Sequence, residues 1–127
     1  QIEARIIGDM CLNHVIPAAV RYQNILIENV KGMKDIFGDD YLNYCASEIE
    51  TLKKISTYIN NVSADVEGLV EARKKANRIE AIAERAKVYS YEVKDMMEKV
   101  RMSADNLEML IDDEVWPLPK YRELLFF

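Results

Sequence analysis

The sequence predicts an all-α protein, folded as an antiparallel up-down-up bundle of three long helices with coiled-coil-like packing. Only four glycines and three prolines occur in 127 residues, so a sheet would lack turn residues while helix formers abound. Apolar residues recur at alternating steps of three and four, which is the pattern of helices that pack side by side. Two turn signals divide the chain into segments of similar length, which favours antiparallel neighbours.

The opening helix is expected at about residues 2–37, and it carries more apolar surface than one seam needs. Two stripes can be drawn along it, one through Ile6, Met10, Ile16, Val20 and Ile27, the other through Leu12, Val15, Ala19, Tyr22, Leu26, Val30, Met33 and Phe37. The stretch from Met10 to Val20 has no formal charge, although 31% of the chain is charged. We therefore expect a second protein surface, besides the other two helices, to pack on this helix. Pro17 removes one backbone donor and crowds the carbonyl of Asn13, so a kink is expected there.

The second helix is expected at about residues 41–75, after Gly38 ends the first one. Its stripe comprises Cys45, Ile49, Leu52, Ile55, Ile59, Val62, Val66 and Leu69. Gly68 weakens this prediction by about 1 kcal/mol relative to alanine. A break near Ser63, which would give four helices, is the alternative.

The third helix is expected at about residues 78–114, with Asn77 and Glu80 forming a capping box at its start. It has the strongest periodicity, through Ile79, Ile82, Ala86, Tyr89, Val93, Met96, Val100, Ser103, Leu107 and Leu110. Two prolines after Trp116 end the helix, and residues 115–127 form an apolar and aromatic tail that should pack on a surface.

The composition indicates one domain, 1–127, and gives no reason to expect a nucleic acid, since the net charge is −5. No apolar run approaches the roughly 18 residues of a membrane span. Gln1 is not a natural translation start, so we expect a cytoplasmic fragment of a longer chain. Cys11 and Cys45 would lie roughly 30 Å apart along the hairpin, so both are expected to be reduced thiols.

Residues that could support chemistry do not converge. His14 has no second imidazole beside it, and we expect a hydrogen-bonded histidine in a packed interface rather than a metal ligand. Asp39, Asp40, Asp112, Asp113 and Glu114 would meet at one pole as a weak cation site or, as we favour, as solvated helix ends. Arg73, Lys74, Lys75 and Arg78 mark the other pole, where a solvated turn is favoured over an acidic or phosphate partner.

Two segments carry a family resemblance, namely residues 13–23 (NHVIPAAVRYQ) and residues 116–126 (WPLPKYRELLF). Together with residues 72–77 (ARKKAN) and 97–101 (MEKVR), they resemble the C-terminal region of the type III glutamine synthetases. The resemblance implies a parent enzyme that joins ammonia to glutamate with ATP and magnesium or manganese, through a γ-glutamyl phosphate, in a ring-shaped homo-oligomer of nitrogen metabolism.

In that family the catalytic residues belong to an upstream domain, so the resemblance implies no catalytic, cofactor-binding or metal-binding residue in this chain. We expect a structural extension that docks on the catalytic domain or a neighbouring subunit. The candidate docking surface comprises Leu12, Asn13, His14, Val15, Ile16, Pro17, Ala19, Trp116, Pro117 and Tyr121. The alternatives are a free-standing coiled-coil module that binds partner helices, and a self-sufficient enzyme with polar groups inside the bundle.

Overall fold

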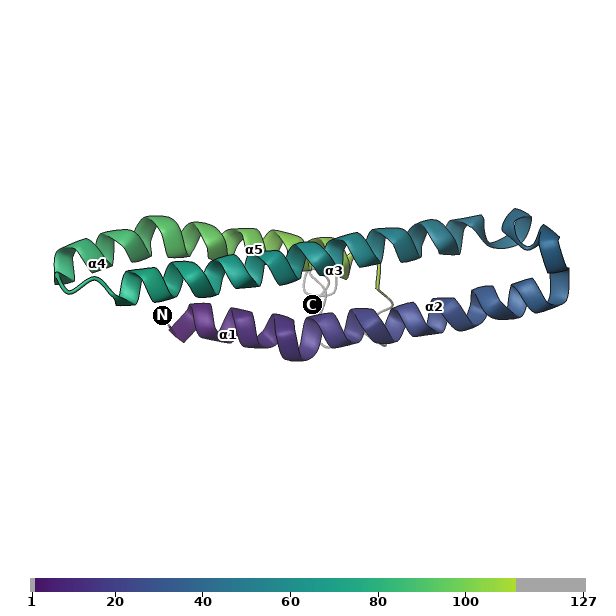
Figure 1. Cartoon of the computed structure of the whole chain (residues 1–127), viewed down its shortest axis with the longest axis horizontal. Helices are drawn as coiled ribbons and strands as arrows, with labels where there is room; N and C mark the ends of the chain where they lie inside the picture. Colours follow the sequence, from purple (N-terminus) through teal and green to yellow (C-terminus); the bar gives the residue numbers. More distant parts are fainter. Residues whose placement is uncertain (1, 112–127) are drawn as a thin grey trace, which may run out of the picture.

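The computed structural model describes residues 2–111, and this part of the chain is a long, slim bundle without strands (Figure 1). A first helical run goes up, α3 returns antiparallel to it, and a third run lies beside α3. The prediction of an all-α bundle of three helices is confirmed. No helix among the described residues is long and apolar enough to cross a membrane.

The first run consists of α1 (Ile2–Met10), a π-helical turn η1 (Cys11–Val15) and α2 (Ile16–Phe37). The N–H of Ile16 donates to the carbonyl of Cys11, five residues back, which is the wide pairing of a π turn. Pro17 therefore lies in the first turn of α2, where its missing N–H leaves no helical bond unmade. The interruption expected at Pro17 takes the form of this π turn.

The turn between the first and second helices confirms the reading of Gly38 as a helix end. Gly38 has a φ of +61° and its N–H donates to the carbonyl of Lys34. A short 3-10 turn, η2 (Gly38–Asp40), then leads into the second helix, and Phe37 and Tyr44 stack with ring centroids 4.1 Å apart.

The second helix, α3, runs from Leu42 to Asn77 and is continuous through Ser63, so the alternative with four helices is wrong. A distortion lies instead at Cys45, whose φ and ψ are −133° and 25°. All eight residues of the predicted stripe are buried or half-buried. Gly68 has a packing role, because a methyl group built there would overlap Cε of Met96 from the third run.

The third run consists of α4 (Ile82–Val88), a π-helical turn η3 (Tyr89–Val93) and α5 (Lys94–Glu108). It is shorter at both ends than the expected range of 78–114. Asn77 completes α3 and accepts a hydrogen bond from the hydroxyl of Tyr89 at 2.5 Å, so it does not cap the third helix. Ala81 is the N-cap residue, in an extended conformation and without a side-chain cap, so the predicted capping box is wrong.

The π turn η3 also changes which residues of the third run face the bundle. From its last residue onward, Val93, Val100 and Leu107 are buried as the stripe predicted. Before it, Ile82 is 82% exposed and Ala86 is exposed, while Arg85 and Val88 are half-buried. A π turn adds one residue to the helical repeat, which rotates the preceding segment by about one position. The stripe was therefore wrong for Ile82 and Ala86.

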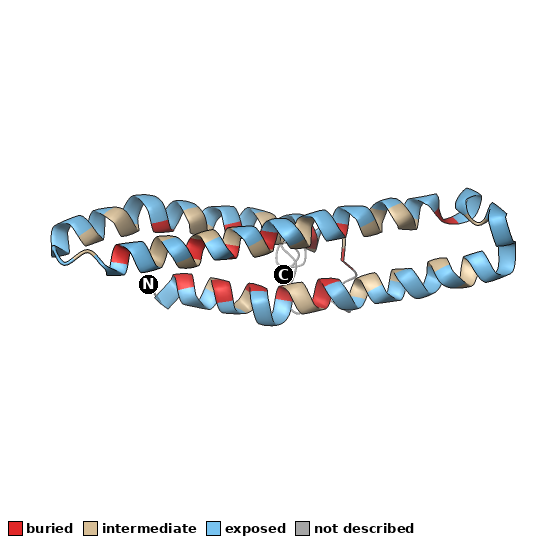
Figure 2. Ribbon diagram, viewed as in Figure 1, coloured by how far each residue is buried: buried red, intermediate tan, exposed pale blue. Residues whose placement is uncertain are grey.

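The core joins all three runs along the half of the rod that contains α1 and α5, as the buried residues in Figure 2 show. It comprises Ala4, Cys11, Val15, Ala19, Ile55, Val62, Val66, Leu69, Ala76, Val93, Val100, Leu107 and Ile111. Ser103, the polar residue of the third stripe, donates to Asp65 of α3 at 2.5 Å. Gln23 of α2 donates to Ser56 of α3 at 2.8 Å.

Candidate docking surface

An open groove lies between α1 and α3, and its lining is mostly apolar. One wall is made by Ala4, Ile6, Gly8 and Leu12, the other by Val66, Leu69 and Val70. The charged residues Arg5, Asp9 and Arg73 complete the lining. Gly8 lies opposite Val66, and a methyl group there would make an ordinary van der Waals contact with Cγ1 of Val66 at 3.9 Å. The groove is an apolar surface bordered by charge, as is common at sites of protein association.

An exposed apolar stripe continues from this groove along the first helical run. Ile6 is 53% exposed, Leu12 51% and Val20 42%, and Ile2 and Ile27 are also exposed. Leu12, Ile16, Val20 and Ile27 follow one another at steps of four, four and seven, so they share one side of the helix. We call the groove and these stripe residues the α1–α2 face.

The structure divides the predicted docking residues into three groups. Leu12, Asn13 and His14 are exposed, and Ile16 and Pro17 are half-buried. Val15 and Ala19 are buried in the bundle's own core, so including them in a docking surface was wrong. The three remaining predicted residues, Trp116, Pro117 and Tyr121, lie outside the described residues.

The error at Val15 and Ala19 has a physical cause. The sequence offered two stripes, and the docking residues were taken partly from the one that packs against α3. The other stripe, through Ile6, Val20 and Ile27, points outward. Sequence reasoning missed Val70 and Arg73 on the α3 wall, because pairing between helices cannot be read from one helix alone.

The polar residues of η1 are both exposed. Asn13 donates to Asp9 at 2.5 Å across one turn of its own helix. The imidazole of His14 is exposed and has no hydrogen bond to any residue between 2 and 111, so a hydrogen bond of His14 in a packed interface stays a prediction. Cys11 and Val15 occupy the buried side of the π turn, which leaves His14 on its outward side.

Both cysteines are buried and free, as expected. Burial raises the pKa of the Cys11 thiol from 9.0 to about 11, because the desolvated site disfavours the thiolate. The thiol of Cys45 donates to the carbonyl of Tyr41 at 3.2 Å. These environments suit structural thiols.

The two charged poles are ordinary helix ends within the described chain. Asp40 accepts a hydrogen bond from Asn43, whereas Asp112, Asp113 and Glu114 lie outside the described residues. At the other pole Lys75 pairs with Glu92 at 3.2 Å, and Arg85 donates to the carbonyl of Ile79 at 2.8 Å. Between residues 2 and 111 no three His, Cys, Asp or Glu side chains come together in a way that could hold a metal ion.

Fold and surface together define an elongated helical domain with an uncovered apolar face on its first helix. The family model described as "Glutamine synthetase C-terminal domain" matches residues 1–34. The chain is 47% identical over 127 residues to a glutamine synthetase of Bacteroides fragilis (strain YCH46), and 27% identical over 142 residues to a type-3 glutamine synthetase of Dictyostelium discoideum.

A glutamine synthetase of Butyrivibrio fibrisolvens is 27% identical over 125 residues. The alignments cover 98–99% of this chain but 17% of each relative, so the chain spans about one sixth of their length. The chain is similar to the C-terminal region of the glutamine synthetases, a type-3 enzyme among them, and the resemblance read from the sequence is confirmed.

Proposed function

We propose that this chain is the helical extension of a cytoplasmic glutamine synthetase and that it docks through the α1–α2 face. The parent enzyme would ligate ammonia to glutamate with ATP and magnesium or manganese, as a homo-oligomer. The extension would contribute structure rather than catalytic groups. Its partner would be the upstream catalytic domain or a neighbouring subunit. The two free thiols support a reducing compartment such as the cytoplasm.

The observation that carries the proposal is a coincidence of two segments. The family model matches residues 1–34, and residues 2–34 lie in the helical run that bears the exposed stripe. A three-helix bundle needs only one stripe per helix for its own core. A second stripe on the segment shared with the family supports contact with another part of the enzyme.

Among the described residues no three His, Cys, Asp or Glu side chains come together in a way that could hold a metal ion. We therefore assign no step of the ligation to this chain. The residues of the α1–α2 face would act by burial of apolar surface, which contributes about 25 cal/mol per Å² removed from water.

The test uses the full-length protein that carries this chain, with Leu12 and Val20 both changed to glutamine. Both side chains are about half exposed here, so the fold of the helical region should survive. We expect loss of assembly or of thermal stability in the whole enzyme, together with slower glutamine formation. The matched control is Ile82→Gln, which changes an even more exposed apolar residue on α4, away from this face.

An L12Q/V20Q enzyme with unchanged assembly, stability and activity would contradict docking through this face. An equal loss in the I82Q control would show that any exposed apolar residue has the effect, and would also contradict it. Glutamine formation by the isolated 127-residue chain would refute the structural role and favour a self-sufficient helical enzyme.

A further inference from the structure

The turn that joins α2 to α3 forms one end of the rod and carries a cluster of exposed apolar side chains (Figure 1). Ile36 is 75% exposed and Leu42 is 52% exposed, and Phe37 and Tyr44, whose rings stack, are exposed as well. Single exposed apolar residues are common on protein surfaces, whereas a cluster of them indicates a contact. We call residues 35–44 the hairpin tip.

The hairpin tip is also the acidic end of the chain. Asp35, Asp39 and Asp40 are all exposed, and residues 35–52 contain no lysine or arginine. This range contains five acidic residues, and the formal net charge of the whole chain is −5. Acidic and basic residues therefore balance over the rest of the chain, and the excess negative charge lies at and next to the tip.

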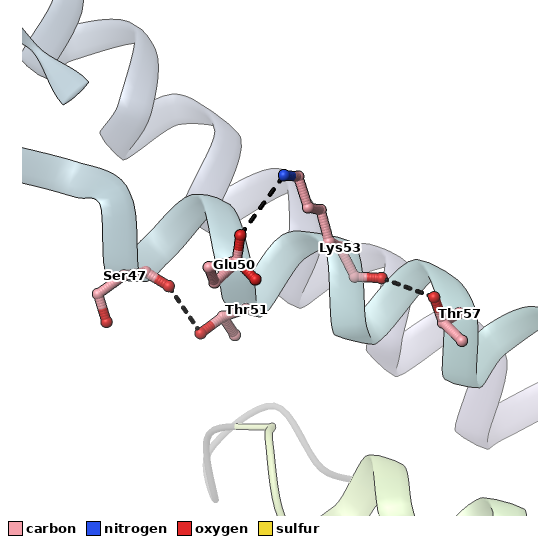
Figure 3. Close-up of polar contacts among 5 residues, drawn as sticks. All are labelled: Ser47, Glu50, Thr51, Lys53 and Thr57. Atoms are coloured by element: carbon pink, nitrogen blue, oxygen red, sulfur yellow. Dashed lines mark hydrogen bonds and ion pairs between the residues drawn. The ribbon is translucent and has the colours of Figure 1, made fainter.

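Beyond the tip, α3 presents a polar face whose groups interact along its own helix (Figure 3). Glu50 pairs with Lys53 at 3.4 Å, and Thr51 donates to the carbonyl of Ser47 at 3.0 Å. Thr57 donates to the carbonyl of Lys53 at 3.1 Å. Local bonds of this kind use the polar groups of the face without a partner. We therefore place the binding surface at the hairpin tip and not on the face drawn in Figure 3.

The tip already holds one cation of its own chain. Nζ of Lys34 lies 5.5 Å from the centre of the Tyr41 ring, which is the geometry of a cation–π interaction. Within residues 2–111 no lysine or arginine forms an ion pair with Asp35, Asp39 or Asp40. Aromatic rings and free carboxylates on one surface are suited to bind lysine and arginine side chains.

The opposite end of the rod, where α3 leads into α4, is basic (Figure 1). Residues 73–78 (RKKANR) contain four basic residues and no acidic one. Lys75 pairs with Glu92, whereas the exposed Lys74 and Arg78 form no ion pair with any residue of the described chain. We call Lys74 and Arg78 the basic turn. Within one copy both ends are ordinary helix ends, and their complementarity appears only between copies.

We propose that the hairpin tip of one copy binds the basic turn of a second copy of this chain. Asp35 and Asp39 pair with Lys74 and Arg78, and the exposed rings of the tip pack on the aliphatic stems of these basic side chains. The ends of one copy cannot meet, because α3 alone has 36 residues and is about 54 Å long.

Such a contact joins two different surfaces, so each copy can bind two neighbours. A heterologous contact of this kind closes into a ring or continues as a chain of copies. The basic turn does not line the groove between α1 and α3. The proposal therefore holds whether or not the α1–α2 face docks as proposed.

The test places a photoreactive benzoylphenylalanine at Leu42 of the full-length protein, with Lys53 on the polar face as the control position. A wild-type copy with a different affinity tag is co-expressed, so crosslinks between copies can be separated from those within one copy. We expect Leu42 to crosslink to a peptide from residues 70–82 of the other copy, and Lys53 to give no such crosslink. Crosslinks from Leu42 to its own copy, to another segment, to another protein, or to none would overturn the proposal.

Charge exchange tests the recognition itself. D35K/D39K in both copies should reduce the crosslink from Leu42 by at least about tenfold, and so should K74E/R78E, because like charges then face each other. The variant with all four substitutions should restore the crosslink to within about threefold of wild type, since the charges are again complementary. Asp40 is left unchanged because it accepts a hydrogen bond from Asn43 within the turn.

The matched control is Lys99→Glu, which reverses an exposed charge on α5 and should leave the crosslink unchanged. Circular dichroism of each variant shows whether the helices have formed, and recovery in the fourfold variant excludes damage to the fold as the cause of the losses. Lack of recovery in a folded fourfold variant, or an equal loss in K99E, would overturn the proposal.

Discussion

Gly38 makes the sharpest stability prediction, because its backbone conformation suits glycine alone. Its φ of 61° and ψ of −135° lie in a region that residues with a Cβ rarely adopt. No heavy atom lies within 4 Å of a Cβ built there, so a methyl group meets backbone strain and no clash. We expect Gly38→Ala to lower the free energy of unfolding by about 1–3 kcal/mol.

Gly32 is the matched control, since it lies inside α2 and a Cβ there also meets nothing within 4 Å. Its backbone is helical, so Gly32→Ala should raise stability by about 0.5–1 kcal/mol. The two alanine variants should then differ by about 1.5–4 kcal/mol in urea unfolding followed by circular dichroism, with equal m-values. A G38A variant as stable as wild type, or two shifts of the same sign, would refute this reasoning.

The remaining predictions concern contacts within the bundle. Gly68→Ala should leave the free energy of unfolding almost unchanged, because the gain in helix propensity is offset when Met96 moves. In a Met96→Ala background the same substitution should stabilise the protein by about 1 kcal/mol. Equal effects in both backgrounds, measured by urea unfolding, would contradict the contact between Gly68 and Met96. Ser103→Ala should cost about 1–2 kcal/mol, because part-buried Asp65 loses its donor, and the cost should shrink in Asp65→Ala. The raised pKa of Cys11 means that the unfolded thiol ionises first, so its contribution to stability is complete below pH 9 and is lost as the pH rises to about 11. Stability should therefore fall less between pH 8 and 11 in Cys11→Ala than in wild type, and parallel falls would rule out this linkage.

Helical periodicity predicted the fold class because a single physical rule governs most of the described chain. The α3 stripe from Cys45 to Leu69 needed no correction, since regular α-helix carries it almost throughout. Errors appeared where the repeat changed. The π turn before Lys94 rotates Ile82 out of the bundle, and no residue type in η3 predicts such a turn. Spacing rules assume a constant repeat and therefore fail before that point.

The candidate surface was only partly predictable for a related reason. Counting stripes showed that the first helix has one more than the bundle requires, but it could not show which one packs on α3. That choice depends on the register between α1, α2 and α3, which appears in the structure as the burial of Val15 and Ala19. The α3 wall of the groove, with Val70 and Arg73, depends on the same register.

The exposed apolar residues of this chain differ in arrangement, and the arrangement decides which of them indicate a function. Ile82 and Met109 are highly exposed but isolated, which is common on protein surfaces. Leu12 and Val20 belong to a helically spaced stripe beside a groove. Substitution of Leu12 and Val20 by glutamine should therefore weaken assembly of the full-length enzyme, whereas Ile82→Gln should leave assembly unchanged.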